Sequence, residues 1–150
     1  MPAYFFDASA LVKRYLRETG SNWIRQLINR GQPRIFISSL SGAEVLAAMM
    51  RKGRTQEARP VARDRAVRAF RSEFATSYAL IAPGPAVIHK AMDLILSYPL
   101  RGYDAVQLAS VLALPVLPDG VTPIFVSADE GLLTVATELG VSTENPNRHP

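Results

Sequence analysis

The sequence predicts a single α/β domain in which helices cover both faces of a central parallel sheet of about five strands. Short apolar runs such as Tyr4–Phe6 and Arg34–Ser38 alternate with longer segments whose apolar residues recur at helical spacing. This alternation is typical of β-α-β units, in which a helix connects two parallel strands. A length of 150 residues fits one domain, residues 1–150, and no internal repeat or linker divides it.

The chain is expected to begin with a strand at Tyr4–Phe6 and to continue directly into a helix that ends at about Arg17. Apolar residues lie on one face of that helix. Ser21 can cap a second helix, which ends near Gly31. The apolar run Arg34–Ser38 is then the second strand.

The middle of the chain is expected to form two helices, over residues 41–50 and 60–77. The pattern does not decide whether the chain breaks or stays helical between residues 53 and 59. A short apolar run at residues 78–82 predicts the third strand.

The last third of the chain is expected to contain two helices, two strands and a final helix. Pro85 suits the first position of a helix, and Gly140 suits a helix end. In order, the expected elements are a helix over residues 85–96, a helix over residues 103–114, a strand–turn–helix unit over residues 123–140, a strand over residues 141–143 and a tail over residues 146–150.

Composition excludes several classes of protein. Cysteine is absent, so disulfides, thiolate zinc sites and cysteine nucleophiles are excluded. No apolar run is long enough to span a membrane, and the first residues do not form a signal peptide, so a cytoplasmic protein is expected.

Positive charge is concentrated in one segment. The net charge is +4, and residues 51–71 carry eight of the 17 lysines and arginines. A solvated helix face and a phosphate-binding surface both fit this distribution. The role of the segment stays open.

Four acidic residues each have an ordinary structural explanation. Asp7 can cap the helix that follows it, and Asp104 and Asp129 lie in first turns, where negative charge suits the helix dipole. The spacings of Ser41–Glu44 and Ser127–Glu130 match a capping box.

Taken together, the same four acids predict a shared site. Asp7 and Asp129 follow expected strands, and Glu44 comes six residues after another. The carboxyl ends of parallel strands open on a common crevice, so these residues and Asp104 are expected to meet there. Like charges at close range repel, and a divalent cation relieves that repulsion. Oxygen ligands without His or Cys suit Mg²⁺ or Mn²⁺.

Four sequence blocks carry these acids and resemble the PIN domain, in particular the VapC-type toxin ribonucleases of prokaryotic toxin–antitoxin pairs. The blocks are FFDASALVKRY, SSLSGAEVLAAM, LRGYDAVQLASV and FVSADEGLL, which contain Asp7, Glu44, Asp104 and Asp129 in turn. The third block is the most distinctive. The resemblance covers nearly the whole chain, except residues 51–82, where no motif matches.

The resemblance implies a metal-dependent endoribonuclease that hydrolyses RNA phosphodiester bonds, acts as the toxin of a type II pair, forms homodimers and is neutralised by a cognate antitoxin. All four acids would be catalytic, with Asp7 and Asp104 as ligands of Mg²⁺ or Mn²⁺. Glu44 would orient the hydration shell of the metal or help to deprotonate water. The hydroxyls of Ser9 and Ser127 are expected to hold carboxylates or to contact phosphate.

Other functions remain open at this point. The same acids would serve a PIN-type nuclease in RNA processing or on DNA, or persist in a non-catalytic binding module. A phospho-receiver domain is disfavoured because it needs a lysine late in the chain and no lysine follows Lys90. A haloacid-dehalogenase-type phosphatase is disfavoured because Ser9 occupies the position where that class needs a second aspartate. The apolar stretch Glu44–Met50 and the basic helix predict more apolar surface than one layer of helices can bury. We therefore expect a second copy of the chain or an antitoxin to cover that surface.

Overall fold

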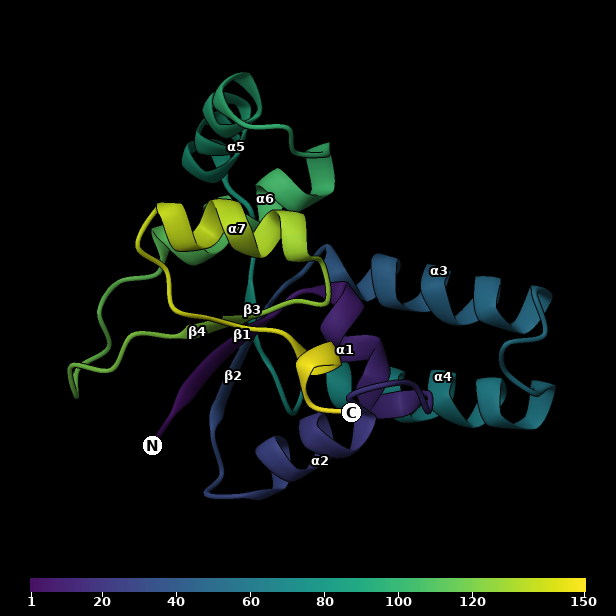
Figure 1. Cartoon of the computed structure of the whole chain (residues 1–150). Coiled ribbons are helices and arrows are strands. Elements are labelled where there is room, and N and C mark those ends of the chain that lie inside the picture. Colours follow the sequence, from purple (N-terminus) through teal and green to yellow (C-terminus); the bar gives the residue numbers. More distant parts are fainter.

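Five parallel strands form the central sheet of the computed structural model, which describes all 150 residues. The strand order is β3-β2-β1-β4-β5, so the first strand lies at the centre (Figure 1). In β1, Phe5 is in register with Phe36 of β2 and with Phe125 of β4. The predicted parallel sheet is confirmed. The strands are β1 (Ala3–Phe6), β2 (Arg34–Ser38), β3 (Ala79–Ile81), β4 (Ile124–Val126) and β5 (Thr143–Glu144).

Helices cover both faces of this sheet, as the sequence predicts. Helices α1 to α4 pack on one face, and α5 to α7 pack on the other (Figure 1). No helix is long and apolar enough to cross a membrane. The helices are α1 (Ala8–Tyr15), α2 (Ser21–Asn29), α3 (Ser41–Arg54), α4 (Pro60–Phe74), α5 (Pro85–Ser97), α6 (Gly102–Ala113), α7 (Glu130–Glu138) and the 3₁₀ helix η1 (Pro146–Arg148).

The central strands direct alternate side chains into two separate cores. Phe6 of β1 and Val126 of β4 belong to the core under α1 to α4. Their neighbours Phe5 and Phe125 belong to the core under α5 to α7, where their rings meet edge to face at 6.0 Å. Successive strand residues point to opposite faces, so a strand buried on both faces must be apolar throughout. This explains the unbroken apolar runs of the sequence.

The boundary between α3 and α4 settles the segment that the sequence left open. Helix α3 continues past Met50 to Arg54, and a turn follows in which Gln56 has a φ of 62°. Helix α4 then begins at Pro60, as predicted, but ends at Phe74. The residues after Phe74 turn back on the helix end, since the amides of residues 76 and 77 both donate to the Glu73 carbonyl.

The carboxyl-terminal residues 146–150 do not extend away as a tail. Pro146 is buried, and the His149 ring stacks on Trp23 of α2 with centroids 4.3 Å apart and planes at 5°. Gly20 lies against Pro146 with a φ of +85°, where a β-carbon would overlap the Pro146 backbone. The short polar sequence gave no apolar pattern, so its packing on α2 was not predicted.

Helix α5 exposes more large apolar side chains than any other element, whereas the stretch Glu44–Met50 exposes few. In that stretch of α3, Val45 and Met49 are fully buried, and only Met50 is a large exposed apolar residue. Helix α5 instead exposes a stripe at spacings of three and four residues. We call it the α5 stripe; it consists of Ile88, Met92, Ile95 and Leu96.

Candidate active site

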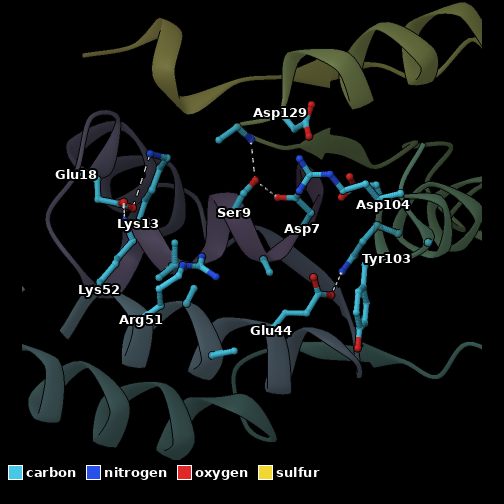
Figure 2. A pocket seen from close by; sticks show the side chains of 18 residues that line it. Asp7, Ser9, Lys13, Glu18, Glu44, Arg51, Lys52, Tyr103, Asp104 and Asp129 are labelled. Atoms are coloured by element: carbon cyan, nitrogen blue, oxygen red, sulfur yellow. Dashed lines mark hydrogen bonds and ion pairs between the residues drawn. The ribbon is translucent and has the colours of Figure 1, made fainter. Parts of the chain in front are cut away.

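The four predicted acids line one cleft at the carboxyl edge of the sheet (Figure 2). The cleft has a volume of about 650 Å³. Asp7 follows β1, Glu44 lies in the first turn of α3, Asp104 in the first turn of α6, and Asp129 follows β4. Four different elements therefore each contribute one carboxylate to the lining of the same cleft.

Asp7 is buried, and hydrogen bonds fix both of its carboxylate oxygens. Oδ1 accepts from the Ser9 hydroxyl at 2.6 Å and from the Ala10 amide at 3.0 Å, so Asp7 caps α1 as predicted. Oδ2 accepts from the Ser127 hydroxyl at 2.6 Å. Burial raises the pKa of Asp7 to about 6, the three hydrogen bonds oppose that rise, and the charge of Asp104 adds to it.

Both serine hydroxyls extend from Asp7 to the turn that carries Asp129. Ser127 Oγ accepts from the Asp129 amide at 3.1 Å, and Ser9 Oγ accepts from the Ala128 amide at 3.0 Å. Each hydroxyl thus donates to Asp7 and accepts from the β4–α7 turn. The expectation that Ser9 and Ser127 hold a carboxylate agrees with these contacts.

Asp129 is the N-cap of α7, because its Oδ1 accepts from the Leu132 amide at 3.1 Å. The capping box predicted for Ser127–Glu130 does not form. Glu130 instead accepts from Arg148 at 2.6 Å and from Asn145 at 2.7 Å. These contacts direct Glu130 toward the carboxyl-terminal residues.

Glu44 also forms no capping box, because the N-cap of α3 is Leu40 and makes no side-chain cap. Instead, the Gln107 amide nitrogen of α6 donates to Glu44 Oε1 and to the Ser41 hydroxyl, both at 3.0 Å. Burial raises the pKa of Glu44, and the charges of Asp7 and Asp104 add to that rise, while the Gln107 bond lowers it. The structural role predicted for Glu44 is therefore wrong.

Asp104 is half-buried and points into the cleft without a hydrogen-bond partner in the protein (Figure 2). Burial raises its pKa, and the charge of Asp129 adds to the rise. Arg101, at the same end of the cleft, lowers it. Asp104 occupies the first helical turn, as the sequence predicts.

None of the four carboxylates forms an ion pair with a lysine or arginine. The pKa values of Asp7, Glu44 and Asp104 are all raised, in part by one another or by Asp129. Uncompensated oxygen donors of this kind fit Mg²⁺ or Mn²⁺ in charge and in chemistry. No three of them lie close enough together in this structure to surround one ion.

The opposite end of the cleft carries basic residues to which the sequence assigned no place in the site, including Arg51 and Lys52 of the basic segment 51–71 whose role it left open. Lys13 of α1 and Lys52 of α3 both pair with Glu18, and Arg51 lies beside them (Figure 2). Lys13 lies four residues after Ser9, on the same face of α1. The spacing from Ser9 could have indicated from the sequence that Lys13 faces the cleft. In the same way, the position of Gln107 one helical turn after Asp104 could have indicated that it lies in the site.

Comparison with known proteins identifies the family. The PIN domain profile matches residues 4–136, from β1 into α7, and includes all four acids of the cleft. The chain belongs to the PIN domain family. No curated protein sequence matches it significantly.

Solved structures share the fold at low sequence identity. VapBC2 from Rickettsia felis, bound to a DNA fragment of its promoter, has 11% identity and a TM-score of 0.61 over 95% of this chain and 98% of that chain. FitAcB from Neisseria gonorrhoeae has 11% identity and a TM-score of 0.63 over 95% and 97%. VapC20 from Mycobacterium tuberculosis, a sarcin–ricin loop cleaving toxin, has 15% identity and a TM-score of 0.63 over 88% and 94%.

Proposed function

We propose that this protein is an endoribonuclease that depends on Mg²⁺ or Mn²⁺ and acts as the toxin of a type II toxin–antitoxin pair. One observation carries the proposal. Four carboxylates from four separate elements line one cleft and form no ion pair, and the pKa values of Asp7, Glu44 and Asp104 are raised by burial and by neighbouring acids. Burying carboxylates without a basic partner costs folding free energy. Their arrangement in one cleft therefore indicates a functional role and not a stabilising one.

In this proposal Asp7 and Asp104 hold the cation. A bound divalent ion would lower the pKa of a water molecule and stabilise charge on the scissile phosphate. Glu44, which Gln107 orients, accepts a proton from the attacking water. Asp129 adds negative charge beside Asp104, and this charge strengthens the attraction of the site for a cation.

Substrate and partners are inferred from the similar structures. VapC20 is described as a sarcin–ricin loop cleaving toxin, which supports RNA as the substrate class. The Klebsiella pneumoniae structure, with 13% identity and a TM-score of 0.64, is a toxin–antitoxin complex, which supports a cognate antitoxin as partner. A second copy of the chain is the other expected partner, through the α5 stripe. Cellular RNA as substrate places the protein in the cytoplasm.

The test compares RNA cleavage with thermal unfolding for the wild type, Asp7→Asn and Asp104→Asn. Asn caps a helix about as well as Asp but lacks the charge that binds a cation. We expect cleavage of single-stranded RNA with Mg²⁺ or Mn²⁺, none in EDTA, and a loss of at least a hundredfold in both variants. Mg²⁺ should raise the unfolding temperature of the wild type more than that of either variant.

The control is Asp93→Asn, which changes an exposed acid on α5 outside the cleft and should behave as the wild type. Full cleavage in EDTA would contradict the metal-dependent mechanism. Cleavage of DNA but not RNA would assign the site to a DNA nuclease. Normal Mg²⁺ stabilisation with no cleavage of either polymer would indicate a non-catalytic binding module.

A further inference from the structure

The cleft continues from the acids as a groove between α1 and α3. Helix α1 lines it with Ser9 and Lys13, four residues apart. Helix α3 lines it with Glu44, residues 47–48 and Arg51, at spacings that place them on one helix face. Residues 47 and 48 are alanines, so the side chains of α3 between the acidic and basic ends of the groove are small and uncharged.

The far end of this groove carries an excess of positive charge. Glu18 accepts from Lys52 and lies 3.8 Å from Lys13, whose side chain is 8% exposed. It therefore holds two ammonium groups at the groove wall. Arg51 is exposed and forms no ion pair. Glu57 lies 3.6 Å from Lys52 but outside the cleft lining.

The polar atoms at this end lack part of their bonding. Lys13 Nζ makes no hydrogen bond and lies 3.8 Å from Glu18 Oε2, which is itself buried without a hydrogen-bond donor. An ammonium group can donate three hydrogen bonds, and Lys13 makes none of them within the protein. Phosphate oxygens would supply acceptors to Lys13 and to the unpaired Arg51 at once.

The distance between the two ends suits one nucleic-acid strand. Glu44 and Arg51 are seven residues apart on α3, which corresponds to about 10 Å along the helix axis. Figure 2 shows Lys13, Arg51 and Lys52 together on the side of the cleft away from Asp104 and Asp129. A strand with its scissile phosphate at the acids would bring a neighbouring phosphate to the basic end.

We propose that Arg51, together with Lys13 and Lys52 held by Glu18, forms a phosphate subsite for the substrate strand beyond the scissile bond. The inference rests on the proposed nuclease function and specifies its substrate as single-stranded RNA that extends past the cleaved bond. Very short substrates, which end before the basic groups, lose this contact. Arg51 contributes to the binding of the substrate and not to the chemical step, because it lies away from the reacting groups.

The test uses Arg51→Gln, with Arg54→Gln as the matched control on the same helix. Arg54 is exposed, forms no ion pair and does not line the cleft. KM and kcat are measured for a dinucleotide and for a twelve-nucleotide RNA, designed with single cleavage sites. We expect Arg51→Gln to raise KM about tenfold for the long RNA, to leave kcat within about twofold, and to leave the dinucleotide unaffected.

A salt series provides an independent readout. Binding of the long RNA is measured by fluorescence anisotropy in EDTA, and loss of one phosphate contact should reduce the slope of log affinity against log salt by about 0.7. Arg54→Gln should keep the wild-type KM and slope. Equal KM values and slopes for wild type and Arg51→Gln would overturn the subsite while the nuclease function stands.

Two further outcomes separate the hypotheses. If the wild type cleaves no RNA with any metal, the proposed function fails and the substrate inference falls with it. If Arg51→Gln loses affinity for an antitoxin but not for RNA, the basic end binds a protein and the phosphate subsite is wrong.

Discussion

Gln107 on α6 donates a hydrogen bond from Nε2 to Glu44 Oε1 on α3 at 3.0 Å. The same amide nitrogen donates to the Ser41 hydroxyl, and Gln107 Oε1 is buried without a partner. Two of the cleft acids, Glu44 and Asp104, neither follow a strand nor cap a helix, and of these two Gln107 orients Glu44. Its contacts join α3 and α6 across the base of the cleft.

Replacing Gln107 with Met should lower kcat and leave KM nearly unchanged. Met has a similar length but cannot donate to Glu44, so the carboxylate would lose its fixed orientation while the substrate contacts remain. We expect kcat to fall about tenfold, the cost of roughly one such hydrogen bond to a charged group. Steady-state cleavage of an RNA oligonucleotide gives both constants.

The double variant tests whether this effect passes through Glu44. In a protein that already carries Glu44→Gln, Gln107→Met should have little further effect on kcat, because the two residues act as a unit. Additive losses would mean that Gln107 supports activity by another route, such as the packing of α6.

The sequence was sufficient for the order of the elements and for the prediction that the four acids line one crevice. Both follow from local rules: apolar strands buried on two faces, and the shared carboxyl edge of a parallel sheet. The predicted capping boxes at Glu44 and Glu130 failed because the distant residues Gln107 and Arg148 offered those carboxylates other donors. Such pairings depend on how helices pack, which no local pattern contains.

The stability of the metal-free protein should fall as the pH rises from about 4 to 6. Burial raises the pKa of Asp7 to about 6 in the folded state, above its value in the unfolded chain. In that interval the folded protein binds more protons than the unfolded chain, so raising the pH favours unfolding. Two pKa units correspond to about 3 kcal/mol, which is lost as the pH rises through about 6.

Chemical denaturation in EDTA at several pH values checks this effect. The unfolding free energy of the wild type, relative to Asp7→Asn, should decrease as the pH rises and become nearly constant above about pH 7. Asp93→Asn provides the matched control and should follow the wild type at every pH. A constant difference between wild type and Asp7→Asn would show that Asp7 titrates alike in the folded and unfolded states.

The α5 stripe is the surface through which we propose that two copies of the chain associate. Met92 is 56% exposed at the centre of the stripe, and Leu96 is 86% exposed. A second copy of the same stripe would cover these side chains, and a lysine at position 92 would place two like charges in that interface. Met92→Lys should therefore convert the dimer to a monomer in light scattering. Met50→Lys, on α3, should leave the dimer intact; the reverse result would place the interface on α3.

The carboxyl-terminal residues should contribute measurably to stability. Deletion of residues 146–150 exposes Trp23, which stacks on His149, and removes the buried Pro146. We expect the unfolding free energy to fall by about 1–3 kcal/mol. Gly20→Ala tests the contact itself, since its β-carbon would overlap the Pro146 backbone. The substitution should destabilise the full chain more than the shortened chain, where only the strain of a positive φ remains. Equal losses in both chains, measured by chemical denaturation, would mean that these residues do not pack against Gly20.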